Sequence, residues 1–430
     1  MTTPITNTGP GSFKPVSGSE RIQSIDVVRG LALLGILVVN SLFFALPLAD
    51  AMGVPEPAPG TESVGIWQWI AFLVVMILFQ YKFMSLFSLL FGVGAAIQFE
   101  RATRAGRRFG LFFLCRLLIL FCIGAIHAVF FWYGDILAQY ALIGVWLLLF
   151  CRLRPVALVI IGTGLLTIAA LIGGTIAGFE ATMALDPEYQ KAMNPDGTLP
   201  VGWLDTMEAA MWNPESPIWR AGELRAYGEG PYIDLFMFRL VTWLFAIVFG
   251  FLQFGWHIMA MFAFGVALYK SGFFGDEGGR LRCWAVAVAL PIGLLLELGA
   301  MLPDWTTPVV VGMSKATHEY GSTLMAFGYA ALVTTIVRGG QLRMIAHVIA
   351  CTGRMALTVY LAETVIMTSL FYSYGFGLFG EVDRIWLIPI SLGTWIALAV
   401  FSTLWLGSFK QGPMEWLWRV LSYGISGSRG

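Results

Sequence analysis

Long apolar blocks constrain the fold of this chain more than any other feature of its sequence. Each block is about 20 residues long, enough for a helix to cross a bilayer, and short charged segments separate the blocks. Of the 430 residues, 58% are hydrophobic and 12% are charged, whereas a soluble domain carries roughly 25% charged residues. The sequence therefore predicts an all-α polytopic membrane protein whose first partner is the lipid bilayer. The net charge of zero gives no sign of the basic face that a nucleic-acid partner requires.

About ten transmembrane helices are predicted from these blocks. The predicted spans are 25–49, 82–99, 109–131, 136–151, 155–178, 252–270, 283–302, 318–337, 345–372 and 385–407. Two more apolar stretches, 66–80 and 235–250, each directly precede a predicted span. We expect them to be interfacial helices or extra membrane helices.

The distribution of Lys and Arg predicts the orientation. With ten spans, the RATRAGRR run at 101–108 and most other basic residues fall on the same side as the N-terminus. Because basic loops stay in the cytoplasm, both termini are expected there.

Five segments are expected along the chain: a disordered cytoplasmic tail at 1–24, a transmembrane bundle at 25–178, an extracytoplasmic acidic and aromatic loop at 179–234, a second bundle at 235–407, and a cytoplasmic tail at 408–430. The loop is too rich in Trp and Tyr for a purely disordered linker, so it is expected to fold partly over the outer face. The stretches 79–98 and 254–270 both contain an apolar run that ends in Phe-Gly-Val, which hints at duplicated halves.

Ionisable residues inside a membrane are costly and are therefore candidates for function. On the first predicted helix, Asp26 and Arg29 are three residues apart and can pair, and Asn40 returns to nearly the same face eleven residues after Arg29. This stripe is either a substrate-binding surface or an ion pair that fixes helix packing. Lys82, at the start of the next span, is a further candidate for substrate binding.

The most suggestive segment is 116–144. Arg116 and His127 are eleven residues apart and share a face at different depths, and Asp135 lies in the turn that follows His127. A carboxylate beside an imidazole fixes its tautomer and raises its basicity, as a general base requires. The predicted catalytic pair is therefore His127 and Asp135, with a structural histidine that is hydrogen-bonded across helices as the alternative.

Late in the chain, Arg354 is expected near the middle of the membrane, where a guanidinium needs a carboxylate, carbonyls or an anionic ligand. Tyr360 and Glu363 follow it and complete the predicted substrate-binding set. Glu297 and the His318–Glu319 pair form a further polar set at the outer side, whereas His257 looks like an isolated structural histidine. The sequence contains no HExxH motif and no Cys/His pair at zinc spacing, so neither a metal site nor a bound cofactor is expected.

Four stretches carry a resemblance to a known family. They are Asp26-x-x-Arg29-Gly30 through Asn40; Phe87-Ser88-Leu89-Leu90-Phe91-Gly92; His127 with Gly134-Asp135-Ile136-Leu137 and Tyr140-Ala141; and Gly353-Arg354-Met355-Ala356-Leu357-Thr358 with the terminal Gly412-Pro413-Met414-Glu415-Trp416-Leu417-Trp418-Arg419. In this order they resemble the YeiB-like family of bacterial inner-membrane proteins, a group of largely unknown function. The Asp-x-x-Arg-Gly start also resembles that of the integral-membrane acyltransferase superfamily, which includes heparan-α-glucosaminide N-acetyltransferase.

That second resemblance implies transfer of an acyl group from a cytoplasmic donor, such as acyl-CoA, to a small-molecule, lipid or glycan acceptor at the outer face. His127 would then be the general base, Asp135 would orient it, and Arg29, Arg116 and Arg354 would contact the anionic parts of the donor. A transporter or exporter of a small anionic or amphipathic solute is the alternative, and a scaffold or sensor without turnover is a third hypothesis. Homodimer formation stays open.

Overall fold

The computed structural model describes residues 22–55, 63–187, 202–210, 213, 216–301, 307–340 and 342–427. Every regular element within these ranges is helical, which confirms the predicted all-α polytopic class. Most of the predicted tail 1–24 lies outside the described residues. The helices are α1 Gln23–Ala45, α2 Leu48–Met52, α3 Ile66–Leu78, α4 Lys82–Arg104, α5 Phe109–Phe130, α6 Leu137–Ile143, η2 Gly144–Trp146, α7 Leu147–Phe150, α8 Pro155–Met183, α10 Trp203–Ala209, α11 Pro217–Gly228, α12 Tyr232–Gln253, α13 Gly255–Lys270, α14 Gly279–Trp284, η3 Ala285–Ala289, α15 Leu290–Met301, α16 Pro308–Arg338, α17 Arg343–Arg354, α18 Ala356–Phe371, α19 Arg384–Ser408 and α20 Pro413–Gly427.

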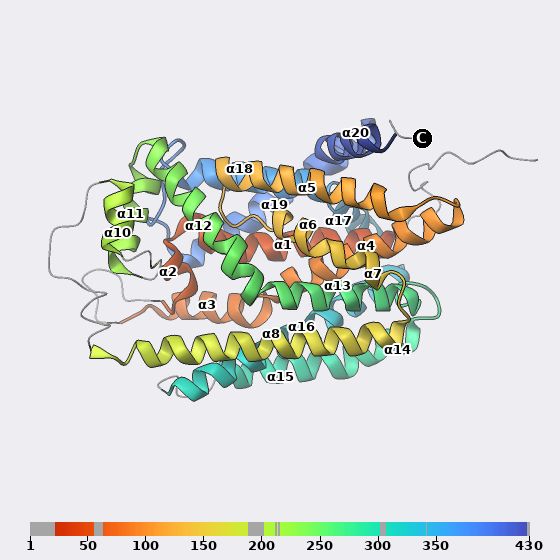
Figure 1. The fold of residues 1–430 in the computed structure, drawn as a ribbon, viewed down its shortest axis with the longest axis horizontal. Coiled ribbons are helices and arrows are strands. Elements are labelled where there is room, and N and C mark those ends of the chain that lie inside the picture. Colours follow the sequence, from red (N-terminus) through yellow and green to blue (C-terminus); the bar gives the residue numbers. More distant parts are fainter. Residues whose placement is uncertain are drawn as a thin grey trace, which may run out of the picture.

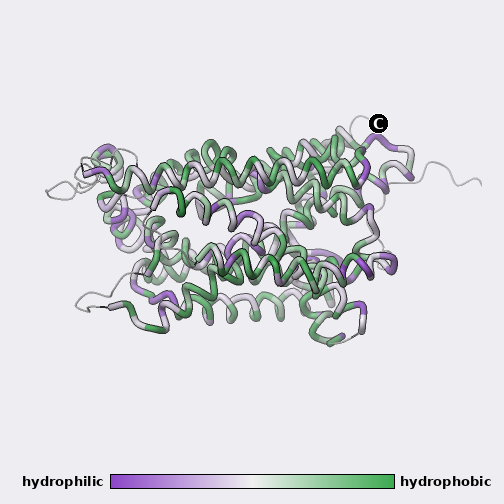
Figure 2. The backbone as a smooth tube through the Cα atoms, turned by 90° about the horizontal axis from the view of Figure 1, so that it is seen from below, coloured by the Kyte–Doolittle hydropathy of each residue, from purple (hydrophilic) through white to green (hydrophobic). Residues whose placement is uncertain are grey.

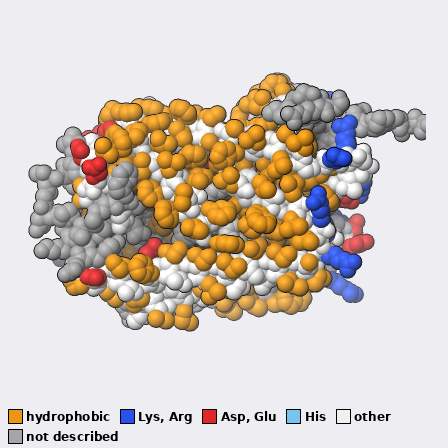
Figure 3. Space-filling view, in the orientation of Figure 1, with side chains coloured by type: hydrophobic (Ala, Val, Ile, Leu, Met, Phe, Trp, Pro, Cys, Tyr) orange, Lys and Arg blue, Asp and Glu red, His pale blue; other side chains and the backbone are white. Residues whose placement is uncertain are grey.

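The long helices run side by side along the longest axis of the molecule, with α10 and α11 at one end and α20 near the other (Figure 1). Apolar side chains cover the flank between these ends. Lys and Arg gather at the α14 end, with some acidic side chains among them, and the other visible Asp and Glu lie toward the α10 end (Figure 3). Hydrophilic stretches also lie within the bundle (Figure 2). This pattern is that of a helix bundle surrounded by lipid, with polar groups buried among the helices.

The structure revises several predicted spans. Among the described residues, eight helical segments are long and apolar enough to cross a membrane, and a ninth arises if α17 and α18 count as one span. The stretch 235–250 belongs to the full-length α12, whereas α13, the core of the predicted span 252–270, has only 16 residues. The predicted span 136–151 is a short apolar segment, Leu137–Phe150, interrupted by the 3-10 turn η2.

The structure also changes two predicted helix boundaries. The stretch 66–80 forms α3, which together with α4 makes one segment of 39 residues, Ile66–Arg104. The predicted single helix 345–372 is broken at Met355, where α17 and α18 meet at an angle of 82°. A sequence window averages hydropathy over such breaks, so it could not locate them.

Glycines bring helix backbones into contact in the core. A Cβ on Gly92 of α4 would lie 2.4 Å from the Phe262 carbonyl oxygen, and one on Gly265 of α13 would lie 2.0 Å from that of Leu89. The two Phe-Gly-Val runs that hinted at a repeat therefore pack against each other. Gly30 of α1 and Gly353 of α17 do the same, since their added Cβ atoms would meet the Ile349 and Asp26 carbonyl oxygens at 2.2 and 1.9 Å.

Helices α10 and α11, which follow α8 in the chain, cover one end of the bundle (Figure 1). Trp219 and Tyr227 of α11 are fully buried there. Glu223 accepts a hydrogen bond from the backbone N–H of Leu48 at 2.9 Å, which ties α11 to the short helix α2. These two helices, α10 and α11, form a cap that is packed onto the bundle through buried side chains.

Candidate functional site

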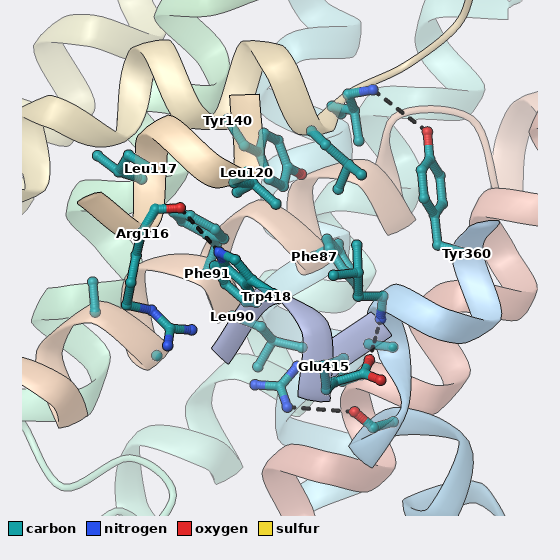
Figure 4. A pocket seen from close by; sticks show the side chains of 18 of the residues that line it. Phe87, Leu90, Phe91, Arg116, Leu117, Leu120, Tyr140, Tyr360, Glu415 and Trp418 are labelled. Carbon is teal, nitrogen blue, oxygen red and sulfur yellow. Dashed lines mark hydrogen bonds between the residues drawn. The ribbon is translucent and has the colours of Figure 1, made fainter. Parts of the chain in front are cut away.

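A cavity of 230 Å³ lies between α1, α4, α5, α6, the α17–α18 break and α20. Most of its wall is apolar, and Figure 4 shows Arg116 and Tyr360 on opposite sides with apolar side chains between them. The apolar wall includes Ile36, Phe87, Leu90, Phe91, Phe113, Leu117, Leu120, Ile136, Leu137 and Leu357. A long apolar group could lie along this wall with a charged group at the arginine side.

Three arginines from distant parts of the chain line this one cavity: Arg29, Arg116 and Arg354. The contact between Gly30 and Gly353 explains part of this convergence, because each glycine adjoins one of the arginines in sequence. No side chain larger than hydrogen would let α1 and α17 approach so closely.

Each arginine has a different environment. Arg29 Nη1 pairs with Asp26 Oδ1 at 3.2 Å, as the three-residue spacing predicted. The Arg116 guanidinium lies 3.9 Å from the ring centroid of Trp418, whose indole N–H donates to the Arg116 carbonyl at 2.9 Å. Arg354 Nε is buried and has no hydrogen-bond partner in the described part of the chain. A buried donor without an acceptor is costly, so Arg354 is suited to an anionic ligand.

Glu415 of α20 also borders the cavity and caps the start of α18. It accepts a hydrogen bond from the backbone N–H of Leu357 at 2.7 Å (Figure 4). It also accepts from the backbone N–H of Thr358 at 3.1 Å and from the Thr358 hydroxyl at 2.6 Å. These are the N–H groups that a helix leaves unpaired in its first turn. The break after Arg354 is thus stabilised by the terminal Gly412–Arg419 stretch.

His127 and Asp135 lie just beyond the Tyr360 wall. His127 Nδ1 is 2.8 Å from Asp135 Oδ2, and both residues are 3% exposed. Asp135 Oδ1 also accepts from the backbone N–H of Ala138 at 2.8 Å. Because a carboxylate only accepts, the hydrogen is assigned to Nδ1, which leaves Nε2 as an acceptor.

That Nε2 atom faces the hydroxyl of Thr364 at 3.0 Å. Thr364 has a second acceptor, the Tyr360 carbonyl at 3.3 Å, so its hydroxyl hydrogen could turn away from His127. The Tyr360 ring is centred 5.3 Å from His127, and its hydroxyl accepts from the Ile136 N–H at 3.4 Å. Tyr360 thus separates the histidine from the cavity, and Thr364 occupies the position where an acceptor hydroxyl could bind.

The structure does not bring all the predicted residues to this site. Asn40 of α1 is half-buried and does not line the cavity. Glu363 is buried with Oε1 unpartnered within the described ranges, but it does not line the cavity either. Lys82 is fully buried in a different cluster, where Nζ donates to Glu297 Oε2 at 2.7 Å.

Sequence reasoning also missed residues that the site contains. Thr364 could have been found, because it lies one helical turn after Tyr360 on the same face. Gln98 and Trp418 also line the cavity, but they come from helices whose packing no local pattern predicts. Gln98 Oε1 is buried and has no hydrogen-bond partner among the described residues.

The fold and the cavity define a class: a polytopic all-α membrane protein with an arginine-lined cavity next to a buried His–Asp pair. The family described as "Protein of unknown function (DUF418)" matches residues 268–425. The chain is 32% identical to "Uncharacterized protein YeiB" of Escherichia coli (strain K12), over 95% of this chain and 98% of the relative. It is 29% identical to "Uncharacterized protein YxaH" of Bacillus subtilis (strain 168), over 96% of each.

The chain therefore belongs to the YeiB-like family, as the sequence motifs indicated. No solved structure matches it significantly. The comparisons show the family, and the long apolar helices show the membrane class. Neither one assigns an activity.

Proposed function

We propose that this protein is a transmembrane acyltransferase that takes an acyl group from an anionic cytoplasmic donor, such as acyl-CoA, and passes it to a hydroxyl or amine acceptor at the outer face. One observation carries the proposal: three arginines and an apolar wall form a single cavity whose Tyr360 side contacts the buried His127–Asp135 pair. The clustering of Lys and Arg at the α14 end supports a cytoplasmic location for that end (Figure 3).

The dimensions along α5 suit an extended donor. Arg116 and His127 are eleven residues apart on α5, which corresponds to about 16 Å at 1.5 Å per residue. Arg116, together with Arg29 and Arg354, would hold the anionic groups of the donor, and the pantetheine arm that joins those groups to the thioester would lie along the Phe87 and Leu120 wall. The thioester carbonyl would then reach the Tyr360 side.

Transfer requires a base at that side. The acceptor O–H or N–H would replace the Thr364 hydroxyl as donor to His127 Nε2, while Thr364 turns toward the Tyr360 carbonyl. His127 would accept the proton as the acceptor atom attacks the thioester carbonyl, and Asp135 would stabilise the imidazolium. The C–S bond then breaks, and the departing thiolate takes the proton from His127.

Ligand-dependent stability of the purified protein tests the donor site. We expect coenzyme A or an acyl-CoA at a hundred times its dissociation constant to add about 2.7 kcal/mol of stability, seen as a thermal shift. Arg354→Gln removes a charged contact worth about 1.5–3 kcal/mol, so affinity should fall by about ten-fold or more. Arg107→Gln, an exposed residue at the Lys and Arg end, is the matched control and should bind like the wild type.

The chemical step needs a separate test. The protein is incubated with membrane extracts and an acyl-CoA whose acyl group is radiolabelled, and both the release of free thiol and the transfer of the label to an acceptor are measured. His127→Asn should abolish transfer of the label and leave donor binding unchanged. Full transfer by His127→Asn would remove His127 from the mechanism, and no shift with any donor in a well-folded sample would remove the donor site.

A transporter of a small anionic solute is the second candidate. The breaks within the α3–α4 and α17–α18 segments favour it, because transporters bind solutes at interrupted helices near the middle of the membrane. Uptake by proteoliposomes that is lost in Arg354→Gln, without acyl transfer, would support transport instead.

A further inference from the structure

A second polar cluster lies among α4, α13, α15 and α16, and none of its charged residues lines the arginine cavity. It is found where two helical segments are interrupted. Tyr81, with a positive φ of 64°, ends the turn between α3 and α4, and Phe254 separates α12 from α13. The rings of Tyr81 and Phe254 are 5.7 Å apart, so the two interruptions are adjacent.

Three side chains form a linear relay in this cluster. The Ser85 hydroxyl is 2.6 Å from His257 Nε2, and His257 Nδ1 is 2.7 Å from Glu319 Oε2. Ser85 and His257 are 0% exposed and Glu319 is 2% exposed. His257, which the sequence suggested to be isolated, is thus held by two polar partners from different helices.

The relay can satisfy all its hydrogen bonds in two protonation states. With neutral His257, Nδ1–H donates to Glu319 and the Ser85 hydroxyl donates to Nε2. With protonated His257, both ring N–H groups donate, to Glu319 and to Ser85, and the Ser85 hydroxyl donates instead to the Tyr81 carbonyl at 2.7 Å. That carbonyl keeps the Ser85 backbone N–H at 2.8 Å in both states. Only one hydroxyl hydrogen has to rotate.

The charged groups around His257 are two lysines and two glutamates. Lys82 pairs with Glu297, which also accepts from His318 Nδ1 at 2.7 Å, and Lys315 donates to the Tyr81 hydroxyl at 2.7 Å. The two lysines balance Glu297 and Glu319, so with both histidines neutral the cluster has no net charge.

The other helices that pack against α13 add little charge. α8 contributes Glu180, which acts electrostatically on Lys315. α6 contributes Tyr140, whose hydroxyl bonds to Ser88 rather than to His257. α7 and the last two turns of α12 carry no titratable residue. The nearest negative partner of His257 is therefore Glu319.

A Ser–His–Glu relay could also serve nucleophilic catalysis, but the surroundings of Ser85 do not favour it. The Ser85 hydroxyl is fully buried, and its backbone N–H, the nearest candidate for an oxyanion hole, already donates to the Tyr81 carbonyl. Proton binding needs neither substrate access nor an oxyanion hole.

We propose that Ser85, His257 and Glu319 form a proton-binding site within the membrane bundle, separate from the arginine-lined cavity. His257 takes up the proton, Glu319 holds the resulting imidazolium as an ion pair, and Ser85 adjusts by turning its hydroxyl. The site stands on its own contacts and does not rest on the acyltransferase proposal.

Solid-state NMR of the full-length protein in lipid, labelled with ¹⁵N-histidine, tests this site. The chain has only four histidines, so the signals can be assigned by substituting His127, His318 and His347 in turn. We expect both ring nitrogens of His257 to be protonated at the low end of the pH range in which the protein stays folded and one at the high end, with a single reversible transition between them. If the protonation state of His257 stays the same over this pH range, the proposal is overturned.

Matched variants identify the partners of the proton. Glu319→Gln removes the negative partner and should move the midpoint of the His257 transition to lower pH by about one unit or more. Ser85→Ala removes the acceptor for Nε2–H and should also move the midpoint to lower pH. Ser88→Ala is the control, because Ser88 is equally buried on α4 but bonds to Tyr140.

The two test variants are independent, so Ser85→Ala still decides if Glu319→Gln does not fold. A midpoint that is the same in Ser85→Ala as in Ser88→Ala and the wild type would overturn the assignment. Covalent labelling of Ser85 by a fluorophosphonate would overturn it in favour of a nucleophilic serine.

Discussion

The cap over the α10 end should loosen as pH rises, because of one buried carboxyl group. Glu223 is 1% exposed, and burial raises its pKa from 4.5 to about 8. The hydrogen bond from the Leu48 N–H acts in the opposite direction but is weaker. At neutral pH the closed cap therefore holds Glu223 protonated, with its carbonyl oxygen accepting from Leu48.

The magnitude follows from the two pKa values. Below the pKa of the open cap, 4.5, Glu223 is protonated in both states and the cap is most stable. Between 4.5 and about 8, opening releases a proton, so the free energy of opening falls by about 1.4 kcal/mol per pH unit. The total loss is about 5 kcal/mol and is complete above the closed-state value of about 8.

Hydrogen exchange of the segment 44–55, corrected for the intrinsic rate at each pH, measures this opening because it contains the Leu48 amide. Glu223→Gln keeps an acceptor for Leu48 and should make the opening free energy independent of pH. Glu208→Gln, an exposed acid on α10, should keep the wild-type dependence. The reasoning fails if the wild type shows no pH dependence, or if Glu208→Gln loses it as fully as Glu223→Gln.

Two further substitutions test the packing and the histidine site. Gly265→Ala places a Cβ 2.0 Å from the Leu89 carbonyl oxygen and should destabilise the protein by roughly 1–3 kcal/mol in thermal denaturation. Gly164→Ala, at an open position of α8, is the control and should not destabilise the protein. Equal effects of the two substitutions would contradict the close contact between α4 and α13. Thr364→Val removes the hydroxyl that donates a hydrogen bond to His127 Nε2, and it should cost about 1–3 kcal/mol of stability while acyl transfer persists. Loss of acyl transfer in a variant that still binds acyl-CoA would give Thr364 a direct role in the reaction.

Sequence spacing predicted contacts within one helix or across one turn. The Asp26–Arg29 pair and the His127–Asp135 contact are both present, because three residues on a helix and a short turn leave few other arrangements. The same reasoning placed Asn40 on the face of Arg29. Eleven residues of helix separate them by about 16 Å, however, and the cavity does not extend that far along α1.

Contacts between helices could not be predicted from the sequence. Ser85, His257 and Glu319 are separated by 172 and 62 residues, and His257 lies in a helix rich in aromatic residues that shows no polar stripe. The prediction for the stretch 345–372 assumed one straight helix, and the 82° bend at Met355 invalidates that assumption. Breaks and helix contacts depend on packing between segments, which one sequence does not record.

The two histidine relays share one design and differ in what they adjoin. Each histidine has a carboxylate on Nδ1 and, on Nε2, a hydroxyl whose alternative acceptor is a carbonyl four residues earlier. Only the His127 relay borders the cavity, through Tyr360. If His127 is the base for transfer, the pH profile of transfer should follow His127, and Ser85→Ala should change the His257 transition but not that profile. A profile that moves with Ser85→Ala would mean that proton binding at His257 and transfer at His127 are coupled through α4, which carries both Ser85 and the cavity-lining Phe87.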